Sequence, residues 1–223
     1  MAERIQRVMV ITAHPDDSEF GAGGTVARLV STDGSKGSGD RAMTPDRLVK
    51  IRAEEQRAAA RVLGVETVDF LGFPDGELED THQSRMAVTA AIRRHRPDLI
   101  ITQNPHRTKN LFASHRDHRI TAGLVLDVVY PLARDHMAFP ELLAQGLEPH
   151  KVKEVHLMWW ENPEVVVDIS DTIDLKFKAL ACHASQIQDM VAVEARVRDR
   201  AARFGRLKGY TYAETFDRIL IER

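Results

Sequence analysis

The sequence predicts one α/β domain built on a parallel, doubly wound sheet. Short runs of β-branched apolar residues alternate along the chain with amphipathic stretches, as they do in such sheets. The length of 223 residues is typical of one domain, and we expect residues 1–223 to form it. With 43% hydrophobic and 29% charged residues, the composition is that of a globular protein.

Five runs predict the strands of this sheet. Each is short, is rich in Val, Ile, Leu or Thr, and is bounded by polar or turn-forming residues. In chain order they are Val8–Thr12, Thr67–Leu71, Leu99–Thr102, Val155–Trp159 and Val165–Ile169. Because stretches of helical length separate several of them, we expect those strands to pair in parallel.

Four amphipathic stretches predict helices: Arg47–Leu63, Gln83–Arg94, Asp117–Val129 and Asp174–Ser185. Gly64 suits the position after the end of the first helix, because glycine adopts the left-handed conformation found there. Pro97 and Pro131 end the second and third, since the residue before a proline avoids helical geometry. Ser170 and Thr172 precede the fourth as N-cap residues.

Two segments lack such patterns. Residues 32–40 are rich in Gly and Ser and predict an exposed loop. Residues 131–150 predict an irregular flap over one end of the sheet. Loops at the carboxyl ends of strands are where open α/β sheets place their sites, so we expect both segments to border the site.

Charge and hydropathy exclude several classes of protein. A net charge of −2 gives no electrostatic footprint for nucleic acid. No apolar run approaches the roughly 18–20 residues that span a bilayer, and no signal peptide precedes the first predicted strand. A single cysteine, Cys182, forms no internal disulfide and suits the reducing cytoplasm, which we expect as the location.

A first polar cluster follows the first predicted strand directly. His14, Asp16 and Asp17 stand at its carboxyl end, and Pro15 restricts the backbone of His14 to extended geometry. Taken alone, an Asp-Asp pair after a strand also suits a turn followed by a helix N-cap.

A second cluster contains His115, Asp117 and His118, and its two histidines share a face if this turn is helical. Taken alone, such a pair also suits a polar surface. Together, His14, Asp17 and His118 make two imidazoles and one carboxylate, an accepted set for catalytic zinc. Asp16 would then act as general base, and His115 would stabilise the oxyanion or protonate the leaving amine. Asp117 would orient a ligand histidine.

These residues form motifs that resemble those of a known family. His14-Pro15-Asp16-Asp17 with Glu19, Gly21 and Gly23-Gly24-Thr25, and later His115-x-Asp117-His118, resemble the LmbE-like (PIG-L) family of zinc-dependent N-acetylglucosamine deacetylases. Supporting motifs are Arg52-x-x-Glu55, Leu71-Gly72-Phe73-Pro74-Asp75-Gly76, Arg96-Pro97-Asp98, His183-x-Ser185-Gln186 and Tyr212-Ala213-Glu214-x-Phe216.

The resemblance implies a Rossmann-like domain, with a mainly parallel sheet and helices on both faces. It implies a hydrolase that binds one Zn²⁺ per chain and removes acetyl from an N-acetylated amino sugar or glycoside. The matching residues are His14, Asp17 and His118 as zinc ligands, Asp16 as general base, His115 as the stabilising histidine, and Arg52 as a sugar contact. Asp75 and Asp80 compete for a second sugar contact. Small members of this family self-associate, and Trp159-Trp160 suits an interface, so we expect a homo-oligomer.

The chain departs from the family pattern twice. Arg116 stands where the family usually has proline. The region 26–40 is short, because only Val26–Ser31 separate Thr25 from the next loop, whereas a crossover requires roughly 10–12 residues. Either the helix is reduced to a turn and Ala27–Thr32 is the strand, or the strand is missing, or the chain has been shortened there.

Three other functions compete with deacetylation. One is an amidase that cleaves a larger acyl group from a sugar-thiol conjugate. Another is a metal-bound interaction protein without catalysis, which the short region and Arg116 favour. The third is a dinucleotide-binding module, indicated by Gly21-x-Gly23-Gly24 but lacking the acidic residue that should follow about twenty residues later.

Overall fold

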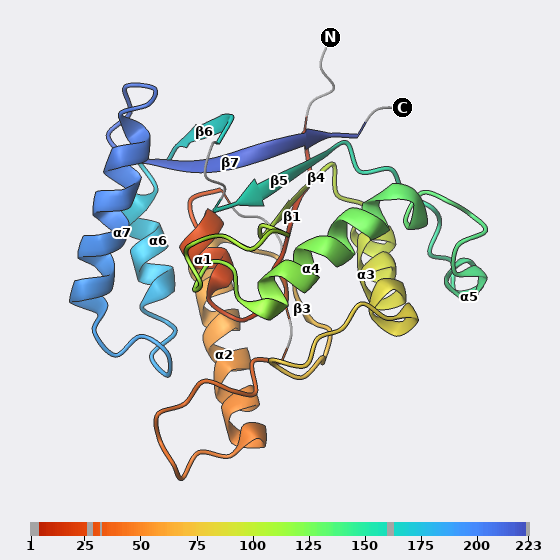
Figure 1. Cartoon of the computed structure of the whole chain (residues 1–223), viewed down its shortest axis with the longest axis horizontal. Coiled ribbons are helices and arrows are strands. Elements are labelled where there is room, and N and C mark those ends of the chain that lie inside the picture. The colour runs from red at the N-terminus through yellow and green to blue at the C-terminus, as the bar shows by residue number, and fades with distance from the viewer. Residues whose placement is uncertain (1–4, 26–28, 32, 160–162, 222–223) are drawn as a thin grey trace.

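The fold is a seven-stranded sheet flanked by helices (Figure 1). The structure is a computed structural model and describes residues 5–25, 29–31, 33–159 and 163–221. Within these residues the strand order is β3-β2-β1-β4-β5-β7-β6. The strands are β1 (Val8–Ile11), β2 (Leu29–Ser31), β3 (Val68–Phe70), β4 (Leu99–Thr102), β5 (Glu154–Met158), β6 (Val165–Asp168) and β7 (Ala213–Leu220).

Most of the sheet is parallel, as predicted. The five neighbouring strands β3, β2, β1, β4 and β5 pair in parallel, and Met9 of β1 lies opposite Ile100 of β4. The last strand, β7, lies between β5 and β6 and is antiparallel to both. The strand order reverses at β1, whose neighbours are β2 and β4, so the switch point of the sheet lies beside β1.

Side chains of β1 alternate between the two faces, and each face is covered by helices. Met9 and Ile11 pack with residues of α3 (His82–His95) and α4 (Arg116–Asp127). Val10 packs on the opposite face with residues of α1 (Asp17–Ala22) and α2 (Pro45–Leu63). All three side chains are buried, so the central strand is covered on both faces, as its continuous apolar sequence predicts.

The predicted helices are present with small shifts at their ends. Thr44 caps α2 by accepting a hydrogen bond from Arg47 N, and Gly64 ends it in the left-handed conformation at φ 71°. Helix α4 is followed by η1 (Val128–Leu132), within which Tyr130 leaves helical geometry before Pro131, and α6 (Ile173–Leu180) is shorter than predicted.

The short region after Thr25 still contains a strand. Helix α1 has only six residues, and β2 follows at Leu29–Ser31 between β1 and β3. This is the first of the three alternatives, although residues 26–28 and 32 lie outside the described residues. Gly21 allows the short helix to lie close to β5, because a Cβ there would collide with the Met158 sulfur.

Two elements near the C-terminus were not predicted. Helix α7 (Met190–Gly205) stands beside α6 at one end of the molecule, and β7 follows it (Figure 1). The two helices share an apolar cluster that includes Phe177, Leu180, Val193 and Val197.

The segment 131–150 is more ordered than a loop and lies along α3. It contains α5 (Pro140–Ala144). Phe139, in its middle, lies beside His82 at the start of α3, and His150, at its end, contacts the carbonyl of Pro97 just after α3. The buried Arg93 guanidinium donates hydrogen bonds to carbonyls of this segment, including Ala133 O. The segment therefore packs against α3, and its role as a flap over the site stays a prediction.

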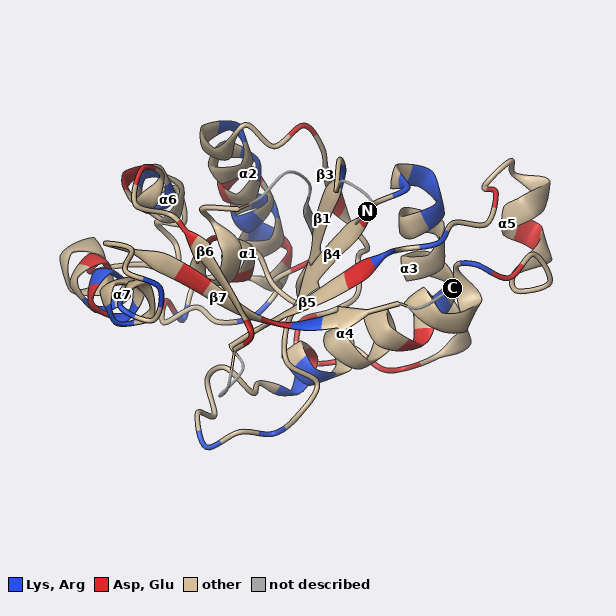
Figure 2. Cartoon of the chain, turned by 90° about the horizontal axis from the view of Figure 1, so that it is seen from above, with Lys and Arg blue, Asp and Glu red and all other residues tan. Residues whose placement is uncertain are grey.

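Basic and acidic residues are interspersed along the helices (Figure 2). Among the described residues, no helix combines the length and apolar character needed to cross a bilayer.

Candidate active site

The candidate site lies at the carboxyl ends of β1, β3 and β4, next to the switch point of the sheet. The loop after β1 carries His14, Asp16 and Asp17, and the loop after β3 carries Asp75. The long connection after β4 leads to His115 and to the start of α4. The structure thus brings together the two clusters that the sequence places about 100 residues apart.

Asp17 connects the two histidines predicted to be metal ligands. Its Oδ2 lies 3.4 Å from His14 Nδ1, and its Oδ1 lies 3.3 Å from His118 Nε2. On the other side of the His118 ring, Nδ1 contacts the Ala113 carbonyl at 3.2 Å. If this nitrogen carries the proton, Nε2 keeps its lone pair for a cation, which is how histidine ligands are usually oriented.

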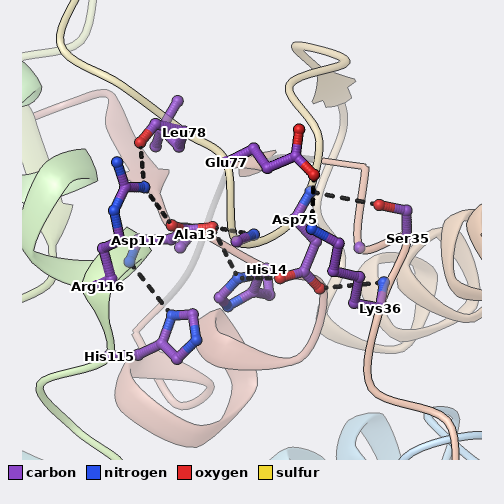
Figure 3. Close-up of polar contacts among 12 residues, drawn as sticks. Ala13, His14, Ser35, Lys36, Asp75, Glu77, Leu78, His115, Arg116 and Asp117 are labelled. Carbon is purple, nitrogen blue, oxygen red and sulfur yellow. Dashed lines mark hydrogen bonds and ion pairs between the residues drawn. The ribbon is translucent and has the colours of Figure 1, made fainter.

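His14 lies between two further carboxylates (Figure 3). Its Nε2 is 3.1 Å from Asp75 Oδ1 and 3.6 Å from Asp117 Oδ2. Burial lowers the pKa of His14, but the carboxylates of Asp117, Asp17 and Asp75 outweigh burial and raise it to about 12. The surroundings of this imidazole therefore favour a positive charge strongly.

Asp117 lies closer to the centre of the site than a residue that only orients a ligand histidine. It is fully buried, faces His14, and accepts a 2.6 Å hydrogen bond from Gly76 N. Arg116 also donates to Asp117 and to the Leu78 carbonyl, so the residue that departs from the family pattern fastens α4 to the 76–78 loop (Figure 3).

His115 stands at the rim of the cluster and is the N-cap of α4. Its Nδ1 accepts a 3.2 Å hydrogen bond from Asp117 N, so the proton of the neutral ring is on Nε2. Burial and the nearby His14 and His118 lower the pKa of His115, which keeps it neutral. Its ring lies 5.0 Å from that of His14.

Asp16 adopts a strained backbone and carries a perturbed carboxylate. Its φ of 94° is unusual for any residue other than glycine and costs on the order of 1–3 kcal/mol. Burial and the Asp17 carboxylate raise the pKa of Asp16 to about 7, despite the opposing charge of Arg52. A carboxylate with such a pKa exchanges protons readily near neutral pH, which suits a general base.

Arg52 connects Asp16 and Asp75. Its guanidinium lies 3.7 Å from Asp16 Oδ2 and 3.6 Å from Asp75 Oδ2, and it donates a 2.8 Å hydrogen bond to the Pro15 carbonyl. Asp80, the other candidate sugar contact, lies outside this cluster. It forms two 2.6 Å hydrogen bonds with Arg85 on the exposed start of α3.

Gln103, which orients Asp17, was not predicted as a site residue. The Gln103 side chain is fully buried, donates to Asp17 Oδ2 at 2.7 Å and accepts from Ala13 N at 3.0 Å. Its position immediately after the predicted strand Leu99–Thr102 was the available signal, because that places it beside the end of β1.

Gln56, which lies behind Asp16, was not predicted either, although Glu19 and His183 beside it belong to the motifs. Gln56 accepts a hydrogen bond from Asp16 N at 3.0 Å and donates to Glu19 Oε1 at 2.7 Å. Glu19 in turn lies 3.4 Å from His183 Nε2, and all three side chains are buried.

The donor atoms of the cluster suit a divalent cation. His14 Nε2 is buried and makes no hydrogen bond of normal geometry, although two carboxylates surround it. Two groups of candidate ligand atoms lie within 4.8 Å of one another, His14 with His115 and His118, and His14 with Asp75 and Asp117. His14 belongs to both, so the residues present fit a metal ion bound beside it.

The chain is similar to known deacetylases. Over 94% of its length the chain is 32% identical to diacetylchitobiose deacetylase of Thermococcus kodakarensis, covering 82% of that protein. It resembles the structure of N,N'-diacetylchitobiose deacetylase from Pyrococcus horikoshii, with a TM-score of 0.89 and 30% identity over 97% of this chain and 84% of that one.

GalB, the 4-carboxy-2-hydroxymuconate hydratase of Pseudomonas putida KT2440, has the same fold. The TM-score is 0.80 at 21% identity, over 98% of each chain, and this likeness concerns the fold alone. The model of the family PIG-L, GlcNAc-PI de-N-acetylase, matches residues 9–129. These findings confirm both the α/β fold and the resemblance inferred from the motifs, and the chain belongs to the PIG-L family.

Proposed function

We propose that this protein is a zinc-dependent hydrolase that removes acetyl from an N-acetylated amino sugar, such as a glucosaminide. One observation carries the proposal: Asp17 lies between His14 and His118, with the Asp16 carboxylate next to it in the chain and Arg52 facing Asp16. Two imidazoles and a carboxylate form a catalytic zinc set, and a neighbouring carboxylate with a pKa of about 7 is a suitable base.

In this proposal His14, Asp17 and His118 hold one zinc ion. When bound, zinc supplies Lewis-acid polarisation of the amide carbonyl and makes water more acidic. Asp16 takes a proton from the attacking water, whose oxygen bonds to the carbonyl carbon. His115 donates its Nε2 hydrogen to the developing oxyanion. As the C–N bond breaks, Asp16 gives the proton that it took from water to the amine, and acetate and the free amino sugar leave.

Arg52 and Asp75 are the proposed sugar contacts, because Asp75 lies beside His14 and Arg52 lies beside Asp75 at the edge of the cluster. Asp117 is proposed to hold His14 and the Gly76 loop in place. We further propose that residues 1–223 form one domain, that the protein acts in the cytoplasm, and that it forms a homo-oligomer.

The test combines metal analysis with an amine-release assay. Purified protein is measured as isolated, after chelation, and after zinc is restored, with N-acetylglucosamine and N,N'-diacetylchitobiose as substrates. We expect one zinc per chain, loss of amine release on chelation and its recovery with zinc. Retained zinc without amine release from any N-acylated sugar would favour a non-catalytic role for the site.

A further inference from the structure

A cavity of about 300 Å³ adjoins the candidate site: Asp17 lies in its wall, whereas Arg52 and Asp75 do not. It reaches the site at Asp17 and extends between α1 and α7, beneath the 108–113 loop. Its volume is at the lower end of the range of small-molecule pockets, about 300–1,000 Å³. The cavity is thus much larger than the methyl group of an acetyl substituent requires.

The wall of the cavity is mainly apolar and aromatic. Its apolar lining includes Phe20, Phe112, Trp159, Val197, Ala201 and Phe204, and Thr108, Asn110 and Thr215 add uncharged polar groups. The Trp159 ring also lies 5.4 Å from the ring of His118, so the apolar wall begins beside a proposed metal ligand. Burial of apolar ligand atoms against the aromatic part of this wall is favourable.

The charged groups in the wall already have partners. Lys176 Nζ donates to Glu214 Oε1 at 2.7 Å and to the Phe20 carbonyl at 3.0 Å. Glu214 also accepts from Gly24 N and Thr25 Oγ1, and Arg200 donates to the Phe20 carbonyl. These contacts hold the wall together and leave the aromatic surface as the main recognition feature.

The position of the cavity identifies the part of a substrate that enters it. An amide has two substituents, the amino sugar on nitrogen and the acyl group on carbon. If the sugar lies against Arg52 and Asp75, with the carbonyl at the His14–Asp17–His118 cluster, the acyl group points past Asp17 into the cavity.

We propose that this cavity is an acyl pocket and that the enzyme prefers N-acyl amino sugars whose apolar acyl group is larger than acetyl. The proposal rests on the proposed function and uses the same hydrolysis: the C–N bond breaks, the acyl carbon gains the water oxygen, and the amine gains a proton.

The first experiment measures kcat/KM of the zinc-loaded protein on N-acetyl-, N-butanoyl- and N-hexanoylglucosamine by amine release. We expect kcat/KM to increase by about fourfold per added methylene, the equivalent of ~0.8 kcal/mol per buried CH₂. Hydrolysis of the acetyl substrate with a steady fall for longer chains would overturn the acyl pocket and leave the proposed function intact.

Two variants and one control locate the effect. Ala201→Phe fills the cavity and should reduce the hexanoyl-to-acetyl ratio of kcat/KM at least tenfold. Phe204→Ala enlarges the cavity and should move the preferred chain length upward, so the test does not depend on one variant folding. Ala195→Phe adds the same ring on the exposed face of α7 and should change nothing. Equal losses for both substrates in Ala201→Phe would contradict the proposal.

A binding measurement separates the two proposals if no substrate is hydrolysed. N-hexanoylglucosamine is titrated against the zinc-loaded Asp16→Asn variant while tryptophan fluorescence is followed, because Trp159 lines the cavity. Saturable quenching that Ala201→Phe abolishes supports the acyl pocket even if the proposed chemistry fails. Absence of quenching overturns the pocket.

Discussion

Gln56 on α2 accepts a hydrogen bond from the backbone N–H of Asp16, at a residue whose φ of 94° places it in the left-handed region. The Gln56 side-chain amide also donates to the buried Glu19 carboxylate, and this second bond fixes the orientation of the amide. The Arg52 bond to the Pro15 carbonyl holds the preceding peptide. Helix α2 therefore keeps the proposed base in a conformation that its own backbone disfavours.

We predict that Gln56→Met, which keeps the length of the side chain but removes both hydrogen bonds, lowers kcat by about 10- to 100-fold. KM and zinc content should change little, because Asp16 rather than the sugar contacts or ligands is displaced. Steady-state kinetics and metal analysis measure this. The control is Gln83→Met on exposed α3, and equal kinetics for the two variants would show that Gln56 does not position Asp16.

We predict that Asp16→Asn keeps zinc but loses about 10²- to 10⁴-fold in kcat, because an amide cannot take a proton from water. The melting temperature should not fall, since the change removes a carboxylate that is buried beside that of Asp17. Amine release and metal analysis provide the measurement. Undiminished turnover by Asp16→Asn would refute its assignment as general base.

Substitution of Asp75 and substitution of Asp80 should have clearly different effects on the kinetics. We predict that Asp75→Asn raises KM by about tenfold or more, because it removes a charged partner of a sugar hydroxyl. Asp80→Asn should behave as the native protein, since Asp80 contacts Arg85 on the exposed surface. Metal analysis accompanies the kinetics, and loss of zinc from Asp75→Asn would identify Asp75 as a ligand instead of a sugar contact.

His156 should make folding sensitive to acid. Burial lowers the pKa of His156 below its ordinary 6.5, despite a contact with Glu154. The unfolded chain therefore binds this proton more readily than the folded chain does. The contribution of neutral His156 to the free energy of unfolding is fully present above about pH 6.5. It is lost as the pH falls through the lower pKa that His156 has in the folded chain.

Urea unfolding near pH 7.5 and near pH 5.5 tests this prediction. His156→Gln should reduce the loss of unfolding free energy between these two values. The exposed His136→Gln serves as the control and should leave the loss unchanged. An identical pH dependence in His156→Gln and the native protein would contradict the prediction.

The fold was predictable where local pattern and packing agree. The run Leu99–Thr102 is β4 as predicted, because all four residues are apolar or β-branched and all are buried. Strand β7 was missed because Thr215, Asp217 and Arg218 interrupt its apolar side chains. Helix α7 was missed because Ala and Arg dominate it, although its buried residues recur every four positions: Val193, Val197, Ala201 and Gly205.

The site was predictable where chemistry follows a strand directly. His14 and Asp17 stand at the end of β1, so their meeting with His118 required that β4, which precedes the second cluster, lie beside β1 and that the connection to α4 return to this edge. The role of Gln103 depends on the pairing of β1 with β4, which no local pattern specifies. The place of Arg52 came from family resemblance, since nothing in its helix marks one arginine among several.

The bonds of Glu214 to Gly24 and Thr25 have a consequence for the order in which this enzyme becomes functional. Glu214 lies on β7, the last strand in the chain, whereas the loop and helix that it fastens carry the first histidine and both first aspartates. The ribosome makes the ligand residues early, but their support arrives only when almost the whole chain has emerged. A chain that stops after α6 would carry every proposed ligand but lack this support behind α1, so the frame of the site is complete only once β7 has joined the sheet.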